Sequence, residues 1–117
     1  MSSTFEARQR RVELLKLHLI EGRKQAEIAR RLNLTRTRVS QLINIALDDV
    51  VKGRIKLPIW YDISQNKTLV RKMLFYACIH TWPTTHERMQ NFDAISQLTI
   101  QEQLDWVRKS GKVRWYK

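Results

Sequence analysis

The feature that most constrains this chain is a twenty-residue stretch, Gln25 to Asn44, with the sequence QAEIARRLNLTRTRVSQLIN. Apolar residues recur there at helical spacing on both sides of Asn33, and asparagine tolerates the positive φ of a tight turn. Ala29 supplies the small side chain required where two helices cross closely. The apolar residues expected to lock the two helices together are Ile28, Leu32, Leu34, Val39 and Leu42. The stretch therefore predicts one helix from about Lys24 to Leu32 and a second from about Thr35 to Val51.

These residues resemble the helix-turn-helix of bacterial and phage repressors. The runs Leu34-Thr35-Arg36 and Val39-Ser40-Gln41 are also similar to KorA-type plasmid repressors and to the last region of bacterial sigma factors. The stretch departs from the usual motif at Asn33, where glycine is common. The resemblance implies site-specific binding of duplex DNA, with the second helix in the major groove.

Burial of the apolar face fixes which side chains of the second helix point outward. Arginine, glutamine, asparagine and threonine are the types that read base edges. The predicted base-reading residues are Thr35, Arg36, Thr37, Ser40, Gln41 and Asn44. Arg30, Arg31 and Arg38 flank this face and are predicted to contact phosphates. The alternative is an ordinary three-helix bundle whose polar face is merely solvated.

The charge of the chain favours a polyanionic partner. Lys and Arg number 22 against 11 Asp and Glu, which gives a formal net charge of +11 and a pI near 10.4. Such a field attracts nucleic acid or an anionic membrane surface. A basic protein with no polyanionic partner is the alternative.

The sequence also indicates the cellular compartment in which the protein is expected. We expect no signal peptide, because the N-terminal MSSTFEARQRR is polar, and no membrane partner, because no apolar run is long enough to cross a bilayer. Cys78, the single cysteine, fits a reducing compartment. The expected location is the bacterial cytoplasm or nucleoid.

The predicted fold class is mainly α, with an N-terminal helix-turn-helix unit of three helices and a small helical second module. The first helix is expected from about Thr4 to Glu21, with an apolar stripe of Val12, Leu15 and Leu19. The predicted parts are a DNA-binding domain at 1–53, a linker or short strand at 54–68, and the second module at 69–117. The middle part is assigned because Gly53 and Pro58 interrupt the helical period and Ile55, Leu57 and Ile59 alternate with other residues.

The second module is predicted to contain helices at 69–80, 85–92 and 100–110. Thr84 with Glu87, and Thr99 with Glu102, have the spacing of capping boxes. The end of the module resembles that of a winged-helix domain in the spacing of Ile100, Leu104, Val107, Gly111 and Val113. That resemblance implies a terminal strand at 113–116, which could pair with 55–59. The alternative is a plain helical dimerisation domain with a core of Leu74, Phe75, Trp82, Phe92 and Trp106.

Basic and aromatic residues are mixed in the tail RKSGKVRWYK. Such mixtures suit phosphate contact and base stacking. The candidate second DNA contact consists of Arg108, Lys109, Lys112 and Arg114. Alternatively, these cations are solvated and the aromatics belong to a core or an interface.

Catalytic and metal-binding motifs are lacking, so the sequence predicts no enzyme, no cofactor and no metal site. Cys78 and His80 are two residues apart in an expected helix, which points them to different sides. The predicted function is that of a transcriptional repressor of bacterial, phage or plasmid origin that binds double-stranded DNA as a homodimer. The alternatives are a DNA-recognition subunit for packaging or replication initiation, and a basic factor that contacts RNA polymerase or RNA.

Overall fold

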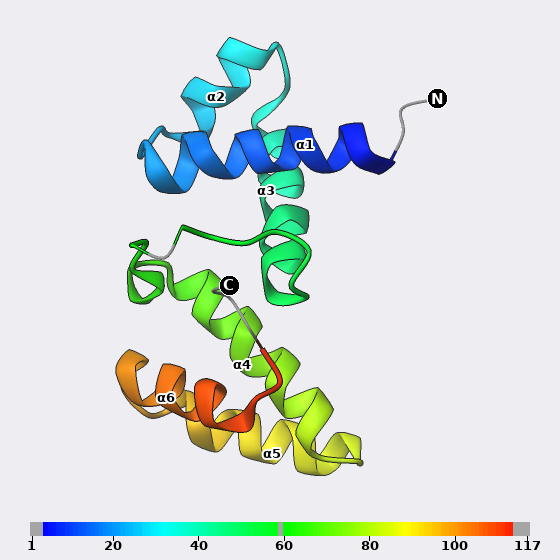
Figure 1. Ribbon diagram of the computed structural model, residues 1–117, viewed down its shortest axis with the longest axis vertical. Helices are drawn as coiled ribbons and strands as arrows, with labels where there is room; N and C mark the ends of the chain where they lie inside the picture. The colour runs from blue at the N-terminus through cyan, green and yellow to red at the C-terminus, as the bar shows by residue number, and fades with distance from the viewer. Residues whose placement is uncertain (1–3, 59, 114–117) are drawn as a thin grey trace. The chain divides into compact units, whose positions relative to one another are not determined.

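A computed structural model of the chain describes residues 4–58 and 60–113. Within those residues it contains six α-helices, one π-helical segment, one 3₁₀ turn and no strand (Figure 1). The chain divides into two compact units, residues 1–49 and 50–117. The predicted fold class, mainly α with a helix-turn-helix, is confirmed.

The first unit is built from α1 (Thr4–Leu15), η1 (Lys16–Ile20), α2 (Gln25–Leu32) and most of α3 (Arg36–Val51). These elements agree with the three predicted helices to within a few residues. Gly22, at φ 68°, has the left-handed conformation that glycine adopts freely, and it lies in the turn between η1 and α2.

The predicted apolar stripe of the first helix is wrong at one position. Val12 is 37% exposed, whereas Leu14 and Leu15 are buried. The helix widens after Leu15 into a π turn, in which the N–H of Glu21 donates to the carbonyl of Lys16 at 3.0 Å. A π turn holds an extra residue, so it changes the facing of the residues after Leu15, such as the half-buried Leu19, and not that of Val12, which precedes it.

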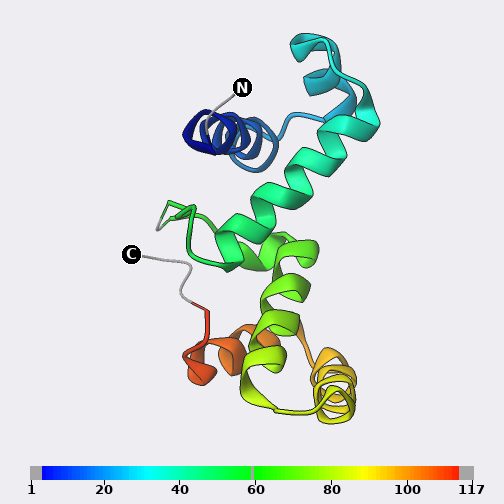
Figure 2. The same ribbon diagram turned by 90° about the vertical axis from the view of Figure 1, so that its right-hand side faces the viewer.

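The second unit contains the 3₁₀ turn η2 (Ile63–Gln65) and the helices α4 (Lys67–Thr81), α5 (Thr85–Ser96) and α6 (Ile100–Ser110). Helix α4 packs against both α5 and α6, as both views show (Figures 1 and 2). Its fully buried residues, which are the centre of this unit, are Leu69, Val70, Met73, Leu74, Ala77 and Cys78.

The aromatic core expected for a plain helical domain is only partly present. Phe92 is buried, but Phe75 is 43% exposed and meets Phe92 edge-on, with ring centroids 5.4 Å apart. Trp82 and Trp106 are half-buried and stack on each other at 5.5 Å. Phe75 is therefore not a core residue, because α4 places it where the α5 ring covers only one side.

The ends of the helices follow the predicted local chemistry. Thr99 and Glu102 form a complete capping box at the start of α6, and the Thr84 side chain accepts a hydrogen bond from the Glu87 N–H at the start of α5. Gly111 ends α6 with a φ of 68°, the left-handed conformation typical of a helix C-terminus.

The segment predicted as a linker or short strand has no strand among its described residues, 54–58 and 60–68. Its buried residues are Ile55, Leu57, Tyr61 and Ile63. Val113 is also buried, while Arg114 to Lys117, and with them most of the predicted terminal strand, lie outside the described residues. The winged-helix form stays a prediction.

Candidate nucleic-acid interface

The turn between α2 and α3 is set by Asn33. This residue adopts the left-handed conformation, with φ 56° and ψ 44°, and its N–H donates to the carbonyls of Ala29 and Arg30. The N–H of Leu34 then donates to the Ala29 carbonyl at 2.9 Å. These bonds satisfy the last carbonyls of α2 and redirect the chain within two residues. Asparagine serves here in place of the usual glycine, as predicted.

The two helices are held together by the residues that the sequence singled out. Ile28, Ala29 and Val39 are each at most 5% exposed. Leu32, Leu34 and Leu42 are half-buried. Ala29 is buried in the last turn of α2, in agreement with the small residue expected at this point.

The opposite face of α3 is open to solvent. Of the predicted base-reading residues, the exposed ones are Thr35, Arg36, Thr37, Gln41 and Asn44, and Ser40 is half-buried. Thr35 also caps the helix, since its hydroxyl accepts a hydrogen bond from the Arg38 N–H at 3.1 Å. The helix therefore presents this polar set from its first three turns.

The predicted phosphate-contacting arginines are exposed as well. Arg30 and Arg31 lie in the last turn of α2, where cations interact favourably with the helix dipole. Arg38 lies in the first turn of α3 beside Gln41, with its Nη1 3.5 Å from Gln41 Oε1. Arg38 therefore lies beside one of the predicted base-reading residues.

A further arginine on this side was not identified from the sequence. A hollow of about 360 Å³ lies between α1, the turn and α3. Its lining residues are Glu6, Ala7, Arg10, Arg11, Leu34, Arg38, Leu42 and Ile45. Arg10 is exposed and lines the same hollow as Arg38, so it adds a cation near the start of α3. Only the tertiary packing of α1 brings it there.

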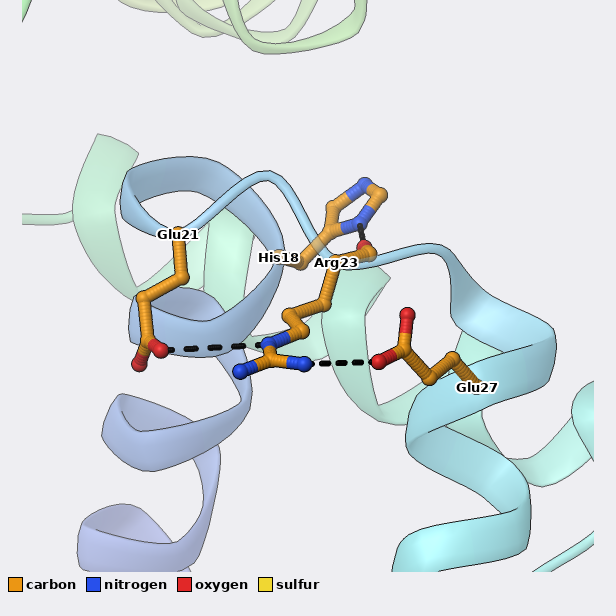
Figure 3. A network of polar contacts seen from close by, with 4 residues as sticks. All are labelled: His18, Glu21, Arg23 and Glu27. Atoms are coloured by element: carbon orange, nitrogen blue, oxygen red, sulfur yellow. Dashed lines mark hydrogen bonds and ion pairs between the residues drawn. The ribbon is translucent and has the colours of Figure 1, made fainter.

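A polar network fixes the loop that leads into α2 (Figure 3). Arg23 Nη1 lies 2.7 Å from Glu27 Oε1, and Arg23 Nε lies 3.9 Å from Glu21 Oε1. The hydrogen bond to Glu27, aided by the charges of Glu27 and Glu21, raises the pKa of Arg23. His18 Nδ1 is 3.1 Å from the Arg23 carbonyl, to which it donates as the neutral Nδ1–H tautomer or as the cation. The network ties η1 to the first turn of α2.

A buried ion pair joins the two long helices of the first unit. Arg11 Nε in α1 lies 2.8 Å from Asp49 Oδ2 in α3, with side-chain exposures of 17% and 3%. A buried carboxylate needs such a partner, because removal from water penalises its charged form. This pair supports the orientation of α3, which carries the exposed polar face.

In the second unit the candidate contact residues lie at the end of α6. Arg108, Lys109 and Lys112 are exposed, and Arg114 lies outside the described residues. Arg108 Nη1 is 3.5 Å from Asp105 Oδ1. The basic residues follow an acidic start of the helix, which contains Glu102 and Asp105.

In the part of the chain that the structure describes, no three His, Cys, Asp or Glu side chains form a cluster able to hold a metal ion. Cys78 is fully buried in α4, and this burial raises the pKa of its thiol to about 11. Among the described helices none has the length and apolar character needed to span a membrane.

Comparison with known proteins gives one match. Residues 4–50 match the family model described as Sigma-70, region 4, which is less than half of the chain. Neither a curated protein nor a solved structure matches the chain. The matched family is one of helix-turn-helix DNA-binding regions and not of enzymes. The match supports a helix-turn-helix DNA-binding protein and confirms the resemblance to the last region of sigma factors.

Proposed function

We propose that the chain is a transcriptional regulator, of the repressor type and of bacterial, phage or plasmid origin, that binds a specific duplex DNA site. One observation carries the proposal. The exposed face of α3 consists of side chains that read bases, and it lies in the stretch that matches Sigma-70, region 4.

The positions of the residues support the roles that we propose for them. Arg36 and Gln41 are exposed near the start of α3, the part of a recognition helix that meets base edges. Arginine pairs with guanine and glutamine with adenine. Arg30 and Arg31 contact phosphates, which position the protein without specifying the sequence.

The assembly proposed is a homodimer on a two-fold-symmetric site. Its half-sites would be about 10 base pairs apart, because a helix-turn-helix dimer meets one face of the duplex at successive major grooves. Sedimentation analysis of the protein with and without its DNA site measures the number of copies in the assembly. A monomer on an asymmetric site contradicts the dimer, and a ring of eight or more subunits favours a role in DNA packaging.

The test begins with selection of bound fragments from random duplex DNA. Arg36→Ala and Gln41→Ala should each weaken binding to the selected site, by about 1–3 kcal/mol of discrimination for a lost bidentate contact. Arg30→Ala should weaken binding to all duplexes alike. Circular dichroism checks that the variants fold. Binding of the Arg36 and Gln41 variants as tight as that of the parent would contradict the assigned face.

A second candidate, contact with RNA polymerase, is favoured by the match to a region of a sigma factor. It is tested by co-sedimentation of the chain with core polymerase in the absence of DNA. Retention of the chain by the polymerase supports this candidate. Free migration of both contradicts it and leaves DNA as the partner.

A further inference from the structure

The segment that follows α3 in sequence has an exposed tryptophan. Trp60 is 68% exposed, more than any other large apolar side chain that the structure describes. The side chains around it in sequence are anchored: Leu57 and Tyr61 are each 7% exposed. Tryptophan is enriched at interfaces, where its large ring is covered by a partner, so an indole this exposed suits a binding site.

Trp60 lies in a turn that a backbone hydrogen bond closes. The N–H of Tyr61 donates to the carbonyl of Pro58 at 3.0 Å. Tyr61 is buried, whereas Trp60 directly before it is exposed. The turn therefore presents the indole to solvent beside an anchored tyrosine.

The same segment is strongly basic. Lys52, Arg54 and Lys56 are all exposed, and residues 52–61 include no acidic residue. The next acidic residue, Asp62, is engaged locally: its Oδ1 accepts hydrogen bonds from the Ser64 N–H at 3.1 Å and from the Ser64 hydroxyl at 2.6 Å. We call Lys52, Lys56 and Trp60 the basic–aromatic loop.

We propose that the basic–aromatic loop binds single-stranded nucleic acid, with its cations on the phosphates and the Trp60 indole stacked on an unpaired base. Cations combined with an exposed aromatic side chain are the two elements of single-strand recognition. In an intact duplex the base faces are already stacked on one another, so this indole suits an unpaired base. The site shares no residue with the exposed face of α3, and the inference does not rest on duplex binding.

The stacking step is tested with the full chain and a fluorescein-labelled oligothymidylate of twelve nucleotides, by fluorescence anisotropy. Trp60→Ala should weaken binding about 5- to 100-fold, the range expected for one lost stacking contact, and Trp60→Phe should retain most of it. Met89→Ala, which shortens a side chain 46% exposed in α5, is the matched control and should change nothing. Circular dichroism confirms that each variant is folded.

The phosphate step is tested by salt dependence. Lys52→Gln with Lys56→Gln should make the slope of log affinity against log salt about 1.4 shallower, since each phosphate contact on a single strand contributes about 0.7. Lys16→Gln with Lys24→Gln removes the same charge from exposed positions of the first unit and should leave the slope unchanged.

Three results would overturn the inference. The first is a Trp60→Ala variant, or the doubly substituted lysine variant, that binds the oligonucleotide like the parent. The second is an indole emission that shifts with phosphatidylserine vesicles and not with the oligonucleotide, which would assign the loop to a membrane surface. The third is dissociation of a homodimer by Trp60→Ala without nucleic acid, which would assign it to an interface between copies.

Discussion

Two stretches of this chain each join two helices by three residues, although Asn33 is left-handed and the corresponding Gln97 is right-handed, and they have opposite chemistry at the start of the second helix. Residues 33–35 join α2 to α3, and residues 97–99 join α5 to α6. A threonine caps the second helix in both: the Thr35 hydroxyl accepts from the Arg38 N–H at 3.1 Å, and the Thr99 hydroxyl accepts from the Glu102 N–H at 3.2 Å. The capping threonine alone therefore does not distinguish them.

The charges do. The first turn of α3 has Arg36 and Arg38 and no acidic residue, whereas that of α6 has Glu102 and no basic residue. The N-terminus of a helix is the positive end of its dipole, so carboxylates stabilise it and cations do not. Helix α6 thus follows the rule for stability, and α3 departs from it in a way that suits an anionic partner. Such departures are expected at functional sites.

The largest expected effect is on the free energy of unfolding, when one ion pair in each unit is broken. Arg11→Leu should lower the free energy of unfolding by about 3 kcal/mol, because it removes an ion-pair partner of a buried carboxylate, Asp49. Arg108→Leu in the second unit, whose pair with Asp105 is exposed, should change it by less than about 0.5 kcal/mol. Urea denaturation followed by circular dichroism measures both. Equal losses would contradict the assignment of Arg11 to a structural role.

The next largest effect is expected from substitutions that reverse the charge in the first turn of α3 or of α6. Arg38→Glu places a carboxylate at the position that Glu102 occupies in α6, so it should stabilise folding by about 0.5–1 kcal/mol. The same change should weaken duplex binding roughly 10- to 100-fold, equivalent to about one lost base or phosphate contact. Glu102→Arg is the matched reversal and should lower stability without weakening duplex binding. If Arg38→Glu binds duplex DNA like the parent, α3 does not face the DNA as proposed.

Local chemistry explains what the sequence could predict. The left-handed Asn33, the capping box of Thr99 and Glu102, and the end of α6 at Gly111 each depend on residues within a few positions of one another. Hydrophobic spacing fixed the buried face of α3 for the same reason, and with it the exposed polar set. The helix-turn-helix can therefore be predicted from twenty residues.

Features set by distant partners could not be predicted. Arg11 and Asp49 pair across 38 positions of the sequence, and Arg10 approaches Arg38 only because α1 packs on α3. The π turn after Leu15 is a backbone feature that apolar spacing does not encode, and the exposure of Val12 depends on which elements pack on α1. Phe75 looked like a core residue because its type favours burial, yet its neighbours in the fold decide its exposure.

A smaller effect would tell whether the second unit adds duplex contacts to those of the first. Lys109→Gln with Lys112→Gln should make the slope of log affinity against log salt about 1.8 shallower if both lysines contact phosphates of a duplex. That corresponds to roughly a tenfold smaller loss of affinity between 50 and 200 mM salt. Arg30→Gln with Arg31→Gln in the first unit is the reference and should produce a similar change. An unchanged slope for the lysine variant would leave the end of α6 as a solvated surface.

The smallest expected effect separates the two roles of Thr35, as a helix cap and as a base-reading residue. Thr35→Ala removes both the hydroxyl and the methyl group, so it should lower stability by about 1 kcal/mol and also weaken specific binding. Thr35→Ser keeps the hydroxyl that accepts from the Arg38 N–H and removes only the methyl group, so stability should be retained while preference for a thymine at the contacted position falls.

The corresponding pair at the other helix provides the control. Thr99→Ala should lower stability by a similar amount, Thr99→Ser should not, and neither should alter duplex binding. All four tryptophans lie in the second unit, so indole emission reports the unfolding of that unit while circular dichroism reports both. If Thr35→Ser keeps both full stability and an unchanged base preference, Thr35 acts only as a cap. The difference between the two helix starts would then rest on the charged residues alone, Arg36 and Arg38 against Glu102 and Asp105.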